Sequence, residues 1–428
     1  MNLQSRFATK LKHKAYLIAF SGGLDSTALL YLFAKQQKIQ PHLTLRAIHI
    51  HHGLSPNADS WATHCQQICH RLGIPLIIEK VKINPQNGIE QGAREARYQA
   101  IQKYRQTEEI VATAHHLQDQ TETFFLALKR GSGIQGLSAM QSESTVYNLP
   151  ILRPLLEFSR AELFAYATQH QLCWIEDESN NDNRFERNFL RHEILPQLRQ
   201  RWEFWDQAVA RSAQHCFEQQ QLINELLQPL FEQKYNKLDR TFSLTDFATY
   251  NENKQNALLR MWLTELQQTM PSQVQLQEIR NKVIFAKIDS NPQFQLNNKI
   301  IRRYQQRLYL TEKFADVKNF YQEIQLGKTL DLPDNLGTFE LSKTVNFLTA
   351  LWTIGKQTYQ TDLPLTTQKI HIKFGYSNPV RLLGDTHHRD IKKVWQNLAV
   401  PPWQRSRIPL IFYGEKLKSA VGFFTTDE

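Results

Sequence analysis

Short apolar runs alternate with amphipathic stretches through the first 180 residues of this 428-residue chain. The pattern predicts buried strands at residues 16–20, 43–50, 76–81 and 110–114, and helices at residues 28–34, 58–72, 89–104 and 121–128. Strands that alternate with helices favour a parallel sheet with helices on both faces. We therefore predict a doubly wound, Rossmann-like α/β domain, whose ligands bind where the strands end.

The second half of the chain has a different pattern. Residues 202–285 are rich in Gln, Leu and Glu, and leucines recur there at helical spacing, which predicts a small helical domain. Extended segments follow near residues 300–310 and 333–347, and residues 370–424 indicate a compact α+β domain. The chain is thus divided into an α/β domain (1–200), a helical domain (201–310), a linker region (311–350) and a C-terminal α+β domain (351–428).

A glycine-rich turn follows the first predicted strand, with the sequence Ser21-Gly22-Gly23-Leu24-Asp25-Ser26-Thr27. The free N–H groups and the positive dipole end of the helix that follows favour a bound anion, and the glycines allow close approach. The hydroxyl groups add donors, and Asp25 can hold the Mg²⁺ that accompanies a polyphosphate. No lysine closes the turn, which excludes a Walker loop. A capped helix alone would also contain serine and glycine, but this density of them favours a phosphate site.

Polar residues also follow the second and third predicted strands. His49 and His51 lie on one side of the second strand by alternation. Arg94 and Arg97 are one helical turn apart after the third strand and could clamp a phosphate. A solvated helix face, with Glu90 and Glu95 as ion-pair partners, is the alternative for the arginines.

The residues after the fourth predicted strand include His115, His116, Asp119 and Glu122. The two carboxylates share a helix face near its start and could hold an ammonium group, or they could simply complement the helix dipole. The histidine pair lacks the spacing of a known zinc motif. Because all these groups come at the ends of successive strands, together they favour an active site.

Charge and cysteine content limit the choice of partners and compartment. The net charge is +10 and the pI about 9.3, which suits a polyanion but does not separate nucleic acid from a membrane surface. No stretch reaches membrane-spanning length, and the short apolar run at 15–20 does not predict a signal peptide.

The four cysteines form no CxxC pair, so no zinc or iron–sulfur site is indicated. We interpret Cys65 and Cys69 as core residues and expect a reducing, cytoplasmic location.

The glycine-rich turn resembles the SGGxDS loop of the PP-loop ATP pyrophosphatases. A longer set of motifs is similar to the tRNA(Ile)-lysidine synthetase family. These are SGGLDST, IHIHHGLS, GIEQGAREARY, TAHHLQDQTETFFLALKRGSGIQGL, RPLL, WIEDESN and RNFLRHEILPQL, and more weakly RLLGD, IKKVWQNLAVPPW and RIPLIFYGEKL. The likeness is close over the first 200 or so residues and weaker beyond them.

This resemblance implies a specific reaction. Members of the family use ATP, with Mg²⁺, and free L-lysine to convert the wobble cytidine of an isoleucine tRNA with a CAU anticodon into lysidine. The cytidine is first adenylated at its C2 oxygen with release of pyrophosphate, and lysine then displaces AMP. The product reads AUA instead of AUG, and the tRNA changes identity from methionine to isoleucine. The expected partners are this tRNA and lysine, without a membrane, and the chain could be a monomer or a homodimer.

The resemblance also implies roles for residues of this sequence. Those expected to bind ATP are Ser21, Gly22, Gly23, Leu24, Asp25, Ser26, Thr27 and His49. Those expected to be catalytic are Asp25, Arg94, Arg97, Asp119 and Glu122, and those expected to bind lysine are His115, Asp119 and Glu122. Those expected to bind tRNA are Arg130, Ser132, Arg187, Asn188, Arg191, Arg381, Lys392, Lys393 and Arg405. Arg187 and Arg191 could equally stabilise the acidic tract at 176–182, and Asp119 or Glu122 could act as a base or only position lysine.

Residues 381–418 contain eight Lys or Arg against three Asp or Glu, a balance that fits binding to an RNA backbone. Trp395 and Trp403 are interpreted as core residues.

The main alternative function is that of a PP-loop tRNA thiolase, but no cysteine lies beside the loop. A small-molecule synthetase fits the basic charge poorly. A non-catalytic RNA-binding protein would be expected to lack Asp25 or the arginine pair.

Overall fold

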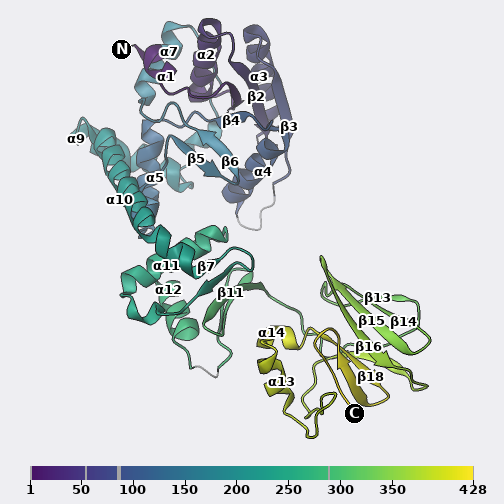
Figure 1. The fold of residues 1–428 in the computed structure, drawn as a ribbon. Coiled ribbons are helices and arrows are strands. Elements are labelled where there is room, and N and C mark those ends of the chain that lie inside the picture. Colours follow the sequence, from purple (N-terminus) through teal and green to yellow (C-terminus); the bar gives the residue numbers. More distant parts are fainter. Residues whose placement is uncertain (1, 54, 84–87, 288–289, 428) are drawn as a thin grey trace. The chain divides into compact units, whose positions relative to one another are not determined.

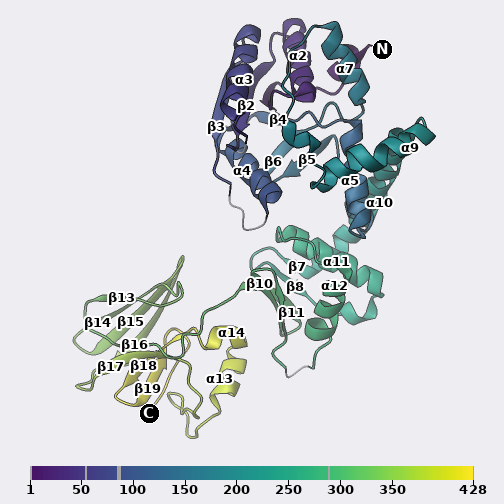
Figure 2. The same ribbon diagram turned by 180° about the vertical axis from the view of Figure 1, so that it is seen from behind.

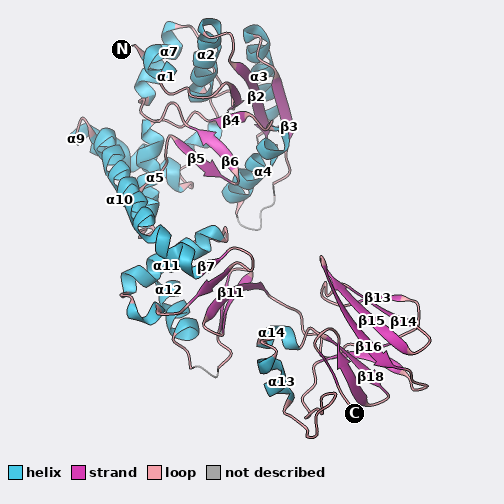
Figure 3. Cartoon of the chain, viewed as in Figure 1, coloured by secondary structure: helices cyan, strands magenta, loops and turns pink. Residues whose placement is uncertain are grey.

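The computed structural model describes residues 2–53, 55–83, 88–287 and 290–427. The chain divides into two compact units, Met1–Leu226 and Leu227–Glu428, and each is described by itself. Figures 1 and 2 show the elements of each unit from two sides, and Figure 3 separates helices from strands. In the described residues, no helix has the length and apolar character needed to span a membrane.

The first unit contains a six-stranded sheet in the order β3-β2-β1-β4-β6-β5. Its strands are β1 (Ala15–Ala19), β2 (Thr44–His51), β3 (Leu76–Lys80), β4 (Glu109–Ala112), β5 (Glu143–Val146) and β6 (Leu149–Leu152). All neighbouring strands run parallel except β5, which pairs antiparallel with β6. The predicted doubly wound parallel sheet is confirmed, and its four predicted strands are present to within about two residues.

The β5–β6 hairpin was not predicted. Its two turn residues, Tyr147 and Asn148, both have positive φ, at 50° and 62°. This backbone twist suits a two-residue hairpin, but it is usually signalled by glycine, which is absent here.

Helices lie on both faces of this sheet. The helices of the unit are α1 (Leu3–Ala8), α2 (Leu24–Ile39), α3 (Ala58–Leu72), α4 (Ile89–Tyr104), α5 (Leu117–Lys129), α6 (Ile134–Leu137), α7 (Arg160–Gln169), α8 (Glu186–Phe189), α9 (Leu195–Arg201) and the first part of α10 (Trp205–Lys234). Tyr16 and Ile18 of β1 pack with residues of α1, α2, α3 and α7, whereas Leu17 packs with residues of α4. This alternation along β1 places apolar side chains on both faces. Cys65 and Cys69 are 0% and 1% exposed, which confirms that they are core residues.

The second unit begins with the end of α10 and a five-stranded antiparallel sheet in the order β7-β8-β11-β10-β9. Its elements are β7 (Tyr235–Asn236), β8 (Thr241–Ser243), α11 (Glu252–Glu265), α12 (Gln273–Ile279), β9 (Gln293–Leu296), β10 (Lys299–Tyr304) and β11 (Arg307–Glu312). Phe242, Trp262 and Ile301 share one core. The expected helical domain is thus incomplete, because its helices pack on a sheet made of short strands that carry little apolar signal.

Residues 311–350 are folded, which corrects their interpretation as a linker. They contain β12 (Tyr321–Glu323), β13 (Thr329–Asp331), β14 (Thr338–Lys343) and the start of β15 (Phe347–Ile354). Phe339 and Leu341 belong to the same core as Phe374 and Ile411 of the C-terminal segment. The short strands and the intervening Pro, Asp, Asn and Gly residues of this segment gave a loop-like pattern.

The C-terminal segment has the expected α+β composition. Its elements are β16 (Gln357–Pro364), β17 (Ile370–Phe374), α13 (Ile391–Asn397), α14 (Pro402–Arg405), β18 (Pro409–Tyr413), β19 (Lys416–Ala420) and β20 (Phe424–Thr425). They form the sheets β13-β14-β15-β16 and β12-β17-β18-β19-β20. Trp395 and Trp403 are 4% and 7% exposed, which confirms their core interpretation.

The turn after β1 depends on a glycine at position 22. Gly22 has φ +90°, and a Cβ there would lie 2.7 Å from Ile175 Cδ1 and 3.0 Å from Cys65 Sγ. Its carbonyl oxygen accepts hydrogen bonds from the Ile175 N–H at 2.9 Å and the Thr27 hydroxyl at 3.2 Å. The turn is therefore fixed both by its backbone conformation and by its neighbours.

We expect Gly22→Ala to destabilise the first unit more than Gly73→Ala. Gly73 also has positive φ, at +69°, but a Cβ there meets nothing within 4 Å. Backbone strain should therefore lower the stability of Gly73→Ala by only about 1–2 kcal/mol. Crowding should cost Gly22→Ala about 1 kcal/mol more. Denaturant midpoints of the two variants measure the difference, and equal midpoints would show that the neighbours of Gly22 yield freely.

Candidate active site

The loop between β1 and α2 is held by its own hydroxyl groups. Ser26 Oγ accepts a hydrogen bond from the Gly22 N–H at 3.2 Å and donates to the Gly23 carbonyl oxygen at 3.0 Å. Ser21 Oγ accepts from the Gly23 N–H at 3.4 Å and lies 3.0 Å from Ser26 Oγ. The serine at position 21 is exposed, whereas Leu24, Ser26 and Thr27 are buried. The loop therefore presents its exposed end, at the N-terminus of a 16-residue helix, to a ligand.

The side chain of His116 lies between an acidic residue of α2 and one of α5. Its Nε2 lies 3.6 Å from Asp25 Oδ2 at the start of α2 and 3.6 Å from Asp119 Oδ2 in α5. Burial opposes a charged imidazole, but Asp119 and Asp25 outweigh it and raise the pKa of His116. Burial likewise opposes a charged Asp119, yet His116 keeps the pKa of Asp119 below its usual value. The imidazole of His116 thus lies between the two carboxylates, across the ends of two strands.

The carboxylate of Asp25 fits a magnesium ligand. Its Oδ1 is buried and has no hydrogen-bond partner among the described residues. An unpartnered carboxylate oxygen beside a polyphosphate loop is the type of donor that Mg²⁺ uses, together with substrate phosphates and water. Over the described part of the chain, no cluster of three His, Cys, Asp or Glu side chains could hold a metal, so this ion would need the substrate's oxygens.

Glu122 is fully buried and pairs with two arginines. Arg191 donates from Nε and Nη2 to its two oxygens at 2.7 and 2.9 Å, and Arg187 Nε lies 3.5 Å from Oε2. The guanidinium of Arg191 is also 3.5 Å from Asp119 Oδ1. Arg187 donates to Thr123 Oγ1 at 2.9 Å. These two arginines thus pair with the carboxylates of α5 and not with the acidic tract at 176–182, while their contact with tRNA phosphate stays a prediction.

Asn188, predicted as a tRNA contact, has a structural role in this arrangement. Its side chain is 8% exposed and donates to the carbonyl oxygens of Ser179 and Asp182 at 2.9 and 3.0 Å. Both amide hydrogens are therefore used to fix the acidic tract. The amide therefore stabilises this loop, and a tRNA contact by Asn188 stays a prediction.

The predicted arginine pair remains available to a ligand. Arg94 and Arg97 are both exposed on α4, and neither forms an ion pair with an acidic residue of the described chain. The alternative in which Glu90 and Glu95 neutralise them is not seen, since Glu95 accepts from Gln91 instead. Burial, helped by the charge of Arg97, lowers the pKa of His52 to about 4. The guanidinium of Arg97 thus adds positive charge near His52, which directly follows β2.

Two further histidines of the site, His49 and His115, have lowered pKa values and polar contacts that orient their rings. His49 is buried, and its Nδ1–H donates to the carbonyl oxygen of Phe20 at 3.0 Å, directly before the loop. Burial lowers the pKa of His49. His115 lies 2.9 Å from Thr113 Oγ1, and burial, against the attraction of Asp119, lowers its pKa to about 4. The pKa values of His115 and His116 thus shift in opposite directions, which was not expected from their adjacency in sequence.

The predicted RNA-binding residues are distributed over both units. In the first unit, Arg130 is exposed at the end of α5 and Ser132 is half-buried in the loop before α6. In the second unit, Lys392 and Lys393 are exposed in the first turn of α13. Arg405 is half-buried and donates to the Val400 carbonyl oxygen at 2.9 Å, and Arg381 donates to the Asp427 carbonyl oxygen at 3.1 Å. The two lysines are thus the more available cations.

Sequence reasoning missed two residues that organise the site. His116 was considered only as a metal ligand, although its position three residues before Asp119 gives the helix a capping box. Asp206, at 6% exposure, accepts from Thr121, Gln118 and twice from Arg199, at 2.6 to 3.1 Å. It ties the start of α10 to α5. No local signal in the sequence marks Asp206, because its partners lie up to 88 residues away.

Comparisons with known proteins cover the whole length of the chain. The PP-loop domain matches residues 2–198, the TilS substrate binding domain residues 242–309 and the TilS substrate C-terminal domain residues 370–428. The tRNA(Ile)-lysidine synthase of Actinobacillus succinogenes is 60% identical over 424 residues, which cover 99% of each chain. That of Haemophilus influenzae strain PittEE is 58% identical over 97% of this chain and 96% of its own. That of Histophilus somni strain 2336 is 57% identical over 100% and 99%.

These matches extend well beyond the phosphate-binding loop, which alone would indicate only an ATP-using PP-loop domain. The alignments with relatives named as lysidine synthases cover nearly the whole chain, so the thiolase alternative is not favoured. The TilS substrate binding domain and the TilS substrate C-terminal domain match the second half of the chain, where the sequence resemblance was weaker. The chain belongs to the tRNA(Ile)-lysidine synthase family.

Proposed function

We propose that this enzyme joins free L-lysine to C2 of the wobble cytidine in the CAU anticodon of an isoleucine tRNA, through an adenylated cytidine. The observation that carries the proposal is the Asp25–His116–Asp119 line, which joins the anion-binding loop to a carboxylate site suited to an amine. Two reactions that share one activated base require such adjacent sites. The product would decode AUA and carry isoleucine identity.

In the first step, the cytidine C2 oxygen attacks the α-phosphorus of ATP, and the bond to pyrophosphate breaks. The backbone N–H groups and serines of the loop after β1 are suited to hold the departing pyrophosphate. A magnesium ion would be held by Asp25 Oδ1 and would neutralise phosphate charge. Arg94 and Arg97, which lack acidic partners among the described residues, could stabilise the charge on the α-phosphate.

In the second step, the lysine ε-amine attacks C2 of the adenylated base, and AMP leaves with the C2 oxygen. We propose Asp119 as the group that receives the ammonium before it loses a proton. Its Oδ1 faces Arg191 only at 3.5 Å, whereas Glu122 is engaged by the same arginine at 2.7 and 2.9 Å. Glu122 is therefore better suited to a positioning role, with Arg191 as its partner.

Binding of the tRNA body is assigned to the second unit. Lys392 and Lys393 are exposed on α13, which lies within the matched TilS substrate C-terminal domain. Phosphate contacts from such lysines position an RNA without reading its sequence. They would complement selection of one cytidine at the site in the first unit.

Replacing Asp25 by Asn should abolish pyrophosphate release, because the neutral amide keeps the shape of the carboxylate but loses its attraction for a cation. We expect a drop of at least about 100-fold in tRNA-dependent pyrophosphate release, with tRNA binding nearly unchanged. Asp59→Asn is the matched control, since Asp59 also lies in the first turn of a helix but is 80% exposed. Normal pyrophosphate release by the Asp25 variant would contradict its role.

Replacing Asp119 by Asn should separate the two steps. The amide oxygen can still accept the His116 N–H that now reaches Asp119 Oδ2 at 3.0 Å, so the helix start is preserved. We expect transfer of label from α-labelled ATP to the tRNA to persist while incorporation of labelled lysine falls at least about 100-fold. Wild-type incorporation of lysine by this variant would refute the assignment.

Charge reversal at Lys392 and Lys393 should weaken tRNA binding and flatten its salt dependence. Loss of two phosphate contacts lowers the slope of log K against log salt by about 1.5–2. A double reversal at Lys328 and Lys356, which are exposed elsewhere in the second unit, gives a control of equal net charge. Filter binding over a salt series measures both slopes, and equal slopes for the two variants would place the RNA contacts elsewhere.

A further inference from the structure

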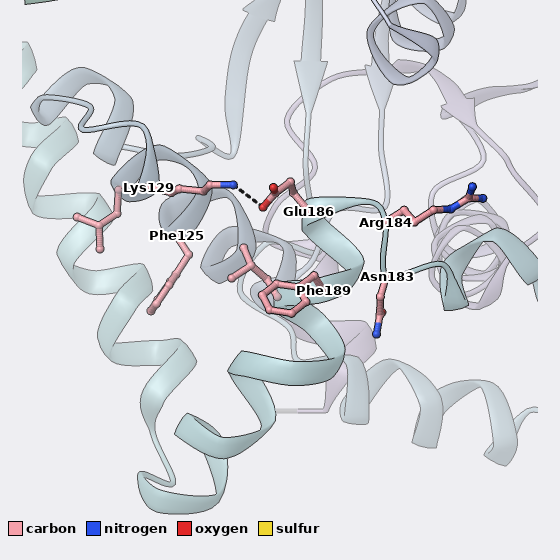
Figure 4. A pocket seen from close by; sticks show the side chains of 8 residues that line it. Phe125, Lys129, Asn183, Arg184, Glu186 and Phe189 are labelled. Carbon is pink, nitrogen blue, oxygen red and sulfur yellow. Dashed lines mark ion pairs between the residues drawn. The ribbon is translucent and has the colours of Figure 1, made fainter.

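A hollow of about 620 Å³ lies beside α5 and is not used by the reaction described above. Figure 4 shows its side chains, which come from the end of α5 and from the segment that leads into and through α8. The lining residues are Phe125, Leu128, Lys129, Asn183, Arg184, Glu186, Phe189 and Leu190. The hollow combines aromatic rings with charged groups of both signs.

The apolar part of the hollow is exposed to solvent. Leu128 is 54% exposed and Phe189 is 43% exposed. Behind them, the ring of Phe125 lies 6.0 Å from that of Trp205, which in turn stacks on Trp202 at 5.1 Å. Trp202 is itself 49% exposed. Exposed apolar groups gathered in one place mark a surface that another molecule covers.

The cations around the hollow form ion pairs of different strength with nearby carboxylates. Lys129 pairs with Glu186 at 2.6 Å, and both side chains are 60% exposed. Arg184 pairs with Asp182 at 2.7 Å and is 89% exposed. An exposed pair such as Lys129–Glu186 contributes little to stability, so an incoming phosphate could replace Glu186 there at little cost. Arg184 is held more firmly, because its Nε and Nη2 both donate to the Asp182 carboxylate. Arg130, the residue after Lys129, is exposed and adds a further positive charge.

The hollow is next to the carboxylates that we assign to the second step. Phe125 and Lys129 lie about 4.5 and 10 Å beyond Glu122 along the axis of α5, at about 1.5 Å per residue. In sequence, Phe189 lies between Arg187 and Arg191, which donate hydrogen bonds to Thr123 and Glu122 of α5. These distances correspond to one to three stacked nucleotides at about 3.4 Å each.

We propose that this hollow binds one unpaired nucleobase of the substrate RNA, adjacent to the reacting cytidine, by stacking on Phe189 and Phe125. The phosphate of that nucleotide would replace Glu186 at Lys129. Proteins that bind single-stranded RNA combine aromatic rings with basic side chains, because every base can stack on a ring and every nucleotide carries a phosphate charge. The inference rests on the proposed function, since it requires an anticodon loop at this site.

Binding of an RNA hairpin with a CAU-containing loop tests the proposal. Phe189→Ala should weaken hairpin binding about 5- to 100-fold, the range expected for one lost base stack. Phe189→Leu keeps an apolar side chain without the ring, so it guards against a folding defect and should also lose most of the affinity. Phe164→Ala is the control, because Phe164 is 52% exposed on α7 and does not line the hollow.

Hairpins with an abasic site at one loop position identify the stacked base. At one position, loss of the base should weaken binding to the wild-type enzyme but cost the Phe189→Ala variant nothing further. If Phe189→Leu and Lys129→Gln bind every hairpin within twofold of wild type, the hollow does not take a nucleotide and the proposal is overturned. Lysidine formation by the wild-type enzyme on full-length tRNA would still support the proposed function in that case, and its absence would refute that function separately.

Discussion

Parallel pairing of β1 with β2 on one side and β4 on the other is the constraint on which the site depends. Ala15 to Ile18 of β1 pair with both neighbours, so these strands leave the sheet at the same edge. Asp25 comes from the connection after β1, and His116 and Asp119 come from the connection after β4. Segments about 90 residues apart in sequence are thereby brought within 3.6 Å.

The second requirement of the site is electrostatic. Glu122 is fully buried, and a buried carboxylate is tolerated only when it is paired and hydrogen-bonded. Arg187 and Arg191 provide this pairing, and they lie in α8 and in the π-helical turn at Leu190–Ile194 that follows it. The same acid that lies beside the proposed amine site thus anchors the segment that forms one wall of the hollow. Packing of that segment and chemistry at α5 are therefore not independent.

The central sheet, the loop and the grouping of site residues could be predicted because each has a local cause. Buried parallel strands are continuous apolar runs, and the glycine turn after β1 is visible within seven residues. The rest depends on partners far apart in sequence. Glu122 could be named as a site residue, but its contact with Arg191 follows from the path of the chain after β6. The fold of residues 311–350 was missed because short strands bury few side chains each, and only their shared core makes them stable.

The contact between Gly22 and Ile175 has a consequence for how the chain matures during translation. The wall of the phosphate loop is supplied by a residue about 150 positions downstream, which at 5–20 residues per second is roughly 8 to 30 s of synthesis. Until then, the carbonyl oxygen of Gly22 lacks the Ile175 N–H and the loop is open on that side. A ribosome-bound chain that already contains β1, α2 and β2 therefore still lacks one of the contacts that fix this loop.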